Sequence, residues 1–251
     1  MIDLLAALQL PDASRLEKRI AKTVLTEHGA VTAADKRAIA DGIEELTWVA
    51  ALKPINCGIA EYRDAQREYL EVAVLRCQLR ASAKASRLAE LIHRAVPYPV
   101  VLITLQGAQQ TLSLAHKRWA HNEAGKWVLD GELVQAQFST QPPAASAVEQ
   151  SFAEALALHR QTGGDFLALM QSYIDTVSAL QLARLSGVWA QPKNVEDAGA
   201  MRERLRRSEE LAFQISQLRQ QLAKATQMQK RVELNLALQQ LNKEKLQVET
   251  D

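Results

Sequence analysis

The pattern of apolar and polar positions changes along the chain, from mixed strand-like and helix-like segments to helical segments alone. Near the start, residues 3–10 form a short apolar helical pattern that Pro11 stops. The basic, amphipathic piece 15–27 leads to Gly29, a residue that commonly follows the end of a helix. Thr32 has a side chain suited to begin another short helix. We expect these pieces to pack on a sheet.

Residues 43–79 contain three segments rich in β-branched or aromatic residues, and each segment predicts a strand. Their sequences are LTWVAAL, INCGIAEY and YLEVAVLRCQL, with breaks at Lys53-Pro54 and around residues 63–67. Because side chains alternate along a strand, Glu71 is expected on a largely apolar face of the third one.

A helix, a hairpin and further strand patterns follow. Residues 83–95 carry apolar side chains at helical spacing, and the pattern ends before Pro97. The apolar run 99–105 and the alternating run 110–116 flank a Gln-Gly-Ala turn and predict a hairpin. Residues 127–138 add one or two strands around an Asp-Gly turn signal.

The expected fold is α+β, with a mixed β-sheet domain and packed helices over residues 1–140. The sequence TQPPAAS at 140–146 is a plausible linker, because adjacent prolines neither continue a helix nor donate to a sheet. Residues 147–191 then predict a pair of helices separated by Gly163-Gly164.

The segment 196–251 is expected to form a long coiled-coil-like helix, since it contains no Pro or Gly after Gly199. At about 1.5 Å per residue, this helix would extend roughly 70 Å. The apolar positions change phase beyond Ala225, which indicates a stutter or a bend. The residues predicted to join a partner or a second copy of the chain are Leu211, Ile215, Leu218, Leu222, Val232 and Leu241.

Composition and charge narrow the class of protein. The 251 residues are 47% hydrophobic and 24% charged, which is ordinary for a globular protein. A net charge of +1 gives no overall attraction to nucleic acid or membrane. The N-terminus lacks the features of a signal peptide, and no segment is apolar enough to cross a bilayer. Two cysteines without a CxxC motif suit a reducing cytoplasm.

One local cluster departs from this charge balance. Between Arg76 and Arg118 the chain has seven basic residues and one acidic residue, Glu90. Lysine and arginine neutralise phosphates, and an aromatic side chain can stack on a base. The candidate nucleic-acid-binding residues, called the basic patch below, are Arg80, Lys84, Arg87, Arg94, Lys117, Arg118 and Trp119. The alternative is a solvated basic helix face.

Glu71 and Lys117 form a second candidate site. Metal-dependent nucleases place carboxylates and a lysine on adjacent strands. The usual carboxylate-x-lysine element would need a base at position 73, which is Ala73. The alternative is that Glu71 pairs with Arg76 or Lys117 in a partly buried ion pair.

The histidines and cysteines do not form a site in the sequence. His116 and His121 are five residues apart, a spacing that does not direct both toward one ion, and His93 is remote from them in sequence. We expect Cys57 and Cys77 to behave as small apolar residues. We therefore predict no catalytic residue, no metal site and no cofactor.

The chain resembles an uncharacterised bacterial family, domain of unknown function 4391. The resemblance is most specific at Arg87–Trp119, where a helix, the sequence HRAVPYPVVL and a hairpin closing on SLAHKR follow one another. Other matching pieces are Lys18-Arg19-Ile20 with Lys22, Asp35-Lys36 with Ile43 and Trp48, and Gln229-Lys230-Arg231-Val232-Glu233-Leu234-Asn235. The resemblance covers nearly the whole chain and transfers no catalytic residue.

This resemblance implies a bacterial cytoplasmic protein encoded beside helicases and DNA methyltransferases in restriction or anti-phage loci. The expected function is a non-enzymatic accessory or scaffold subunit of such a DNA defence assembly. Its C-terminal helix would bind the helicase or methyltransferase, or a second copy of the chain, and the basic patch would contact nucleic acid. The alternative is a divergent metal-dependent nuclease using Glu71 and Lys117.

Overall fold

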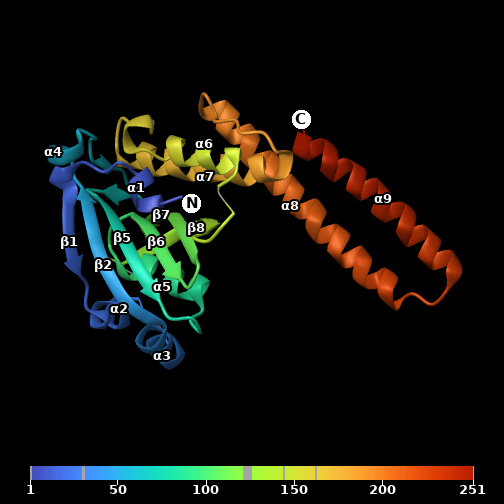
Figure 1. The fold of residues 1–251 in the computed structure, drawn as a ribbon, viewed down its shortest axis with the longest axis horizontal. Helices are drawn as coiled ribbons and strands as arrows, with labels where there is room; N and C mark the ends of the chain where they lie inside the picture. Colours follow the sequence, from blue (N-terminus) through green and yellow to red (C-terminus); the bar gives the residue numbers. More distant parts are fainter. Residues whose placement is uncertain (1, 30–31, 121–125, 144, 162, 251) are drawn as a thin grey trace. The chain divides into compact units, whose positions relative to one another are not determined.

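The computed structural model describes residues 2–29, 32–120, 126–143, 145–161 and 163–250. The chain divides into two compact units, Met1–Val177 (unit 1) and Ser178–Asp251 (unit 2), and each is described by itself. Figure 1 shows the strands gathered in unit 1 and two long helices in unit 2. The α+β class predicted from the sequence is confirmed.

A mixed six-stranded sheet organises the described part of unit 1, in the order β1-β2-β5-β6-β7-β8. Among these strands, β5 and β6 run parallel, and the other neighbours run antiparallel. The strands are β1 (Arg15–Arg19), β2 (Ile43–Leu52), β5 (Val72–Leu79), β6 (Val100–Gln106), β7 (Gln109–Trp119) and β8 (Trp127–Ser139). A separate two-stranded ladder pairs β3 (Tyr62–Arg63) with β4 (Glu68–Tyr69).

Helix α5 (Ala85–Ala95) connects the parallel strands β5 and β6. Parallel neighbours need such a crossover, because a tight turn can only reverse the chain. The apolar side of α5, including Leu88 and Leu91, is fully buried in a core shared with β5, β6 and two further helices. These helices are α2 (Lys22–His28) and α3 (Ala33–Gly42). The crossover thus anchors the main core of unit 1.

Three other helices contact the sheet through β7 or β8. They are α1 (Leu4–Ala7), α6 (Ala147–Ala155) and α7 (Phe166–Ser186), whose last residues enter unit 2. Phe138 of β8 stacks on Phe152 of α6 with ring centroids 5.3 Å apart. In Figure 1, α2 and α3 lie away from α6, with the strands between them.

Two predictions for the N-terminal half were wrong. The amphipathic piece 15–27, which was expected to be helical up to Gly29, is strand β1 followed by α2. Its first residues pair with β2, with Lys18 opposite Trp48. The predicted strand INCGIAEY begins instead as α4 (Pro54–Cys57). Proline suits the first position of a helix, and Gly58 ends it with a left-handed φ of 73°.

Unit 2 is built around a helical hairpin. The segment predicted as one long helix forms α8 (Val195–Lys224) and α9 (Met228–Thr250), with a break at 225–227. The break falls where the apolar positions change phase, so the bend alternative is the one observed. Two packed helices bury each other's apolar stripes, which explains why the chain folds back instead of extending.

Polar contacts fix the register of this hairpin. Arg204 Nε donates to the Val248 carbonyl at 3.2 Å, and Ser208 Oγ donates to Glu249 Oε1 at 2.7 Å. Arg207 pairs with Glu244. The buried apolar residues between the helices are Leu211, Ile215, Leu234 and Leu238.

Gly29 provides a test of how closely α2 approaches α5. A Cβ at this position would lie 2.6 Å from the Leu91 carbonyl oxygen and 2.8 Å from Ala95 Cβ. We predict that Gly29→Ala lowers the free energy of unfolding by about 1–3 kcal/mol, because the helices must separate. Urea unfolding of the full chain measures the change. Gly164→Ala, whose Cβ would meet no heavy atom within 4 Å, is the matched control. Equal stability of the two variants would contradict the close approach.

Candidate binding cleft beside strand β8

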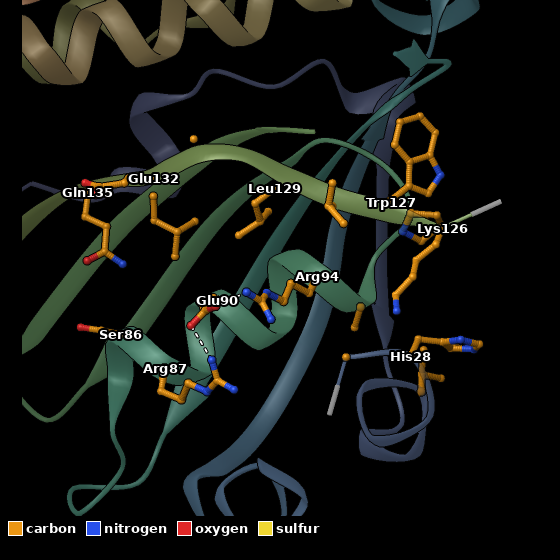
Figure 2. A pocket seen from close by; sticks show the side chains of 17 residues that line it. His28, Ser86, Arg87, Glu90, Arg94, Lys126, Trp127, Leu129, Glu132 and Gln135 are labelled. Atoms are coloured by element: carbon orange, nitrogen blue, oxygen red, sulfur yellow. Dashed lines mark hydrogen bonds and ion pairs between the residues drawn. The ribbon is translucent and has the colours of Figure 1, made fainter. Parts of the chain in front are cut away.

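A cleft of about 1130 Å³ lies between β8, α5 and α2 in unit 1 (Figure 2). Helix α5 forms one wall with its charged side, while β8 forms the facing wall along residues 126–135. Val24 and His28 of α2 close one end. The cleft lies where α5, which packs on the parallel strands, faces the outermost strand β8.

The α5 wall carries two arginines that share one carboxylate. Glu90 pairs with Arg87 at 2.6 Å and with Arg94 at 2.7 Å. Arg87 also donates from Nε and Nη2 to the carboxylate of Asp35 at 2.9 Å, and this contact lowers the pKa of Asp35. Arg87 is therefore held between two acids, whereas Arg94 has 42% of its side chain exposed. Arg94 is the better placed of the two to meet a ligand.

The β8 wall is mainly apolar in its middle and polar at its ends. Leu129 is directed from the strand toward α5 (Figure 2). Lys126 and His28 lie at one end of the cleft, and Glu132 and Gln135 lie toward the other. The lining includes three permanently basic side chains, Arg87, Arg94 and Lys126, and two carboxylates, Glu90 and Glu132, so the cleft is nearly balanced in charge.

Strand β8 was predicted as one or two strands around a turn at Asp130-Gly131. The structure has one strand, which continues through Asp130-Gly131 without a turn. Gly131 adopts a φ of 92°, and the register with β7 shifts between Leu114 and His116. Such a bulge bends a strand and changes its twist without ending it. The sequence Asp130-Gly131 therefore corresponds to a β-bulge in the wall of the cleft and not to a turn between two strands.

Lys117 is buried next to the cleft with 1% of its surface exposed. Its Nζ donates to the carbonyl of Val96, which lies between the lining residues Ala95 and Pro97. Burial lowers the pKa of Lys117 to about 7. The prediction that Lys117 contacts a phosphate is therefore wrong, because strand alternation and the register shift direct its side chain into the core.

His93 is the other buried base of this region. Its Nε2 lies 3.0 Å from Ser113 Oγ, and its surface is fully buried. Burial, assisted by the positive charge of Lys117, lowers the pKa of His93 to about 3. This histidine is a core residue, and its lowered pKa favours the neutral form.

Other residues of the basic patch make contacts within the chain. Arg80 donates to the Asp41 carbonyl at 3.2 Å, and Lys84 precedes the first turn of α5. Arg118 lies 3.4 Å from Asp130, which also pairs with Arg67. Of the seven predicted residues, Lys117 is therefore buried, and Arg80 and Arg118 are held by contacts within the chain.

Trp119 has a different role from the one predicted. Its ring stacks on Trp127 of β8 with centroids 3.7 Å apart. Because the two residues are register partners on β7 and β8, the stack joins the ends of these strands. The aromatic surface of Trp119 is therefore partly occupied within the chain.

The alternative nuclease residues also lie in structural contacts. Glu71 is buried and pairs with Lys53 at 3.1 Å, so its partner is neither Arg76 nor Lys117. The described residues contain no group of three His, Cys, Asp or Glu side chains that could hold a metal ion. His121 lies outside the described residues. Burial raises the pKa of both cysteine thiols, that of Cys77 to about 12.

A polar network on β7 was missed by the sequence argument. His116 Nδ1 lies 3.1 Å from the Tyr69 hydroxyl, and His116 Nε2 lies 3.0 Å from Gln171 Oε1. Gln171 in turn donates to Asp175 at 2.9 Å. These contacts join β4, β7 and α7 within unit 1. No local spacing reveals them, because their members come from three distant segments.

A second surface lies on α9. Leu211 and Ile215 of the predicted seam are buried inside the hairpin, and Leu218, Leu222 and Leu241 are half-buried there. Val232 is instead 53% exposed. The sequence pattern placed Leu211, Ile215, Leu218 and Leu222 on one regular seam and assigned Val232 and Leu241 to a shifted phase. The bend directs most of these six residues to an intramolecular contact.

The fold defines an α+β protein with a cleft beside one sheet edge and a C-terminal helical hairpin. The family profile described as domain of unknown function (DUF4391) matches residues 8–244, and the chain belongs to that family. The resemblance stated from the sequence is thereby confirmed at the level of the family. No curated protein and no solved structure matches the chain. None of the described helices has the length and apolar character needed to span a membrane.

The buried amine of Lys117 predicts a pH dependence of stability. Its folded pKa of about 7 lies below its ordinary value of 10.5, so the unfolded chain binds more protons between these pH values. Its contribution to stability is therefore least favourable below pH 7 and improves as pH rises toward 10.5. Lys117→Met should remove this slope and raise the free energy of unfolding at pH 7 by on the order of 2 kcal/mol.

Urea unfolding at a series of pH values measures this slope. Lys36→Met, at an exposed lysine of α3, is the matched control and should leave the profile unchanged. If Lys117→Met had the same dependence of unfolding free energy on pH as the wild type, the buried amine would not lower the stability of the folded chain.

Proposed function

We propose that this protein is a non-enzymatic accessory subunit of a bacterial DNA defence assembly of the restriction-modification type. It acts in the cytoplasm without a cofactor and binds a partner protein through its C-terminal hairpin. The observation that carries this proposal is a row of exposed apolar residues on α9. These residues are Met228, Val232, Leu236 and Leu246, with 78%, 53%, 61% and 62% of their surface exposed.

Val232 and Leu236 lie on the side of α9 that faces away from α8, whereas Met228 and Leu246 lie about 80–120° around the helix from the packed side. Leu234 and Leu238 mark the side packed on α8, and residues two positions away from them lie about 200° around a helix with 3.6 residues per turn. Helix α9 is therefore apolar on two opposite sides. A helix with this distribution is suited to the interior of a bundle, where neighbours cover both sides.

A helix of a partner protein is the occupant that this surface suits. Helical apolar side chains at such spacing dock into a complementary helical surface. The family setting implied by the sequence makes the helicase or DNA methyltransferase of the same locus the proposed partner. The inner seam of the hairpin is already filled within the chain, so a second copy is not needed to bury it.

The geometry gives less support to the other functions considered. A nucleic-acid-binding surface could not include Lys117, because this side chain is buried, and it would depend on exposed residues such as Lys84. The metal-dependent nuclease would depend on Glu71, which is paired with Lys53. Neither alternative function is supported by an observation as specific as the exposed apolar residues on α9.

The proposal predicts that charge on the α9 row abolishes partner binding. The tagged full chain is purified from its native host, and the co-purified helicase or methyltransferase is then titrated as a purified protein. Combining Val232→Glu with Leu236→Glu should weaken that binding roughly tenfold or more, because charges replace apolar contact area. The thermal unfolding of the free chain should stay the same.

Gln217→Glu, at an exposed position of α8, is the matched control and should bind normally. Equal binding by the α9 variant would overturn the proposed surface. Recovery of the chain without helicase or methyltransferase, or as a self-associated species that needs the row, would overturn the proposed partner.

A further inference from the structure

We propose that the cleft beside β8 is a second docking site, which takes an extended acidic segment of a protein as an added strand. This site lies in unit 1 and is independent of the helical contact proposed for α9. It goes beyond a scaffold role for the hairpin, because it gives the sheet domain a recognition function. The argument rests on the free edge of β8, the position of α5 and the charges of the lining residues.

Strand β8 is the last strand in its sheet and pairs on one side with β7. The backbone groups of an edge strand that point outward are available to pair with another chain. The opposite edge is different, because β1 has five residues, all exposed, and contains Arg15, Glu17, Lys18 and Arg19. Charged residues on a short strand disfavour pairing with another chain. Strand β8 has 13 residues and borders a cleft.

The cleft places a helix beside this free edge. An extended peptide that pairs with an edge strand projects alternate side chains to either side, and a neighbouring helix supplies the surface that reads them. Figure 2 shows α5 running below β8, with Leu129 directed between them. Leu133 and Val24 add apolar surface to the same cleft. The geometry thus suits backbone pairing on one wall and side-chain contacts on the other.

The bulge at Gly131 defines the part of β8 that takes the peptide. Residues 127–130 continue the antiparallel register with β7 on one side of the bulge, from Trp127 opposite Trp119 to Asp130 opposite His116. These residues lie next to Lys126 and near the end of the cleft closed by α2. The added strand is therefore short, and its side chains meet the basic end of the cleft.

The cleft as a whole is nearly balanced in charge, but its end beside α2 has more basic than acidic side chains and therefore suits a carboxylate. Arg94 and Lys126 border this end, whereas Glu132 lies toward the other end. A carboxylate of the peptide can replace part of the Arg94 contact with Glu90, since the Arg94 side chain is 42% exposed. A single-stranded nucleic acid is less suitable, because its repeated phosphates would meet Glu90 and Glu132. A short segment with one or two carboxylates fits this distribution better than a polyanion.

A random peptide library displayed on phage tests the proposal with the full chain as bait. Peptides of about ten residues can pair with residues 127–130 and still extend beyond them at both ends. Enriched peptides are then synthesised, and their binding is measured by fluorescence anisotropy. We expect enriched sequences that combine a carboxylate with an apolar residue. Arg94→Glu should weaken their binding roughly tenfold or more, because it reverses the charge that meets the carboxylate.

Two controls separate this site from the others. Arg37→Glu makes the same charge change on an exposed residue of α3 and should leave binding unchanged. The α9 variant with Val232→Glu and Leu236→Glu should also bind the peptides normally, so the failure of one docking site is distinguishable from the failure of the other. Hydrogen exchange of the wild-type chain provides a measurement that needs no variant, since a bound strand slows exchange in residues 126–135.

The proposal is overturned if no peptide is enriched, or if Arg94→Glu binds the enriched peptides as tightly as the wild type. It is also overturned if the peptides slow exchange in α9 and leave β8 unchanged. Displacement of the peptides from β8 by submicromolar oligodeoxythymidylate would identify the cleft as a nucleic-acid site instead.

Discussion

The packing of α5 on the parallel strands β5 and β6 is the constraint on which the sheet domain depends. Parallel neighbours require a crossover, and the buried side of α5 supplies the apolar surface that holds α2 and α3 in the same core. The opposite side of the helix is consequently charged, with Glu90 between Arg87 and Arg94. This charged side of the helix faces β8 across the cleft.

The same packing explains the unusual buried bases beneath the cleft. Lys117 and His93 lie against the end of α5, and burial lowers the pKa of both side chains. The Val96 carbonyl and the Ser113 hydroxyl give them polar contacts without supplying a carboxylate. Their neutral forms are thus the ones that the core accommodates most easily. The region stabilises polar groups in a core, whereas the exposed ends of the cleft present charge.

The sequence predicted the elements whose signal is local. Periodicity identified α5 and the hairpin of β6 and β7, and the change of phase at Ala225 indicated the break between α8 and α9. The candidate site was predicted less well, because its walls are joined by tertiary structure. Nothing in the local spacing distinguishes Lys117, which is buried, from Arg94, which borders the cleft. That distinction depends on the register shift in β7 and on the side of α5 that the core covers.

Two uncovered surfaces, the outer side of α9 and the cleft beside β8, support the central claim that this protein works by recognition. Hydroxyl-radical footprinting of the free chain and of the assembly purified from the native host tests the claim most directly. We predict that oxidation of Met228 and Leu236 on α9, and of Trp127 and Leu129 on β8, falls in the assembly. Equal oxidation of these four residues in the free and assembled states would contradict it.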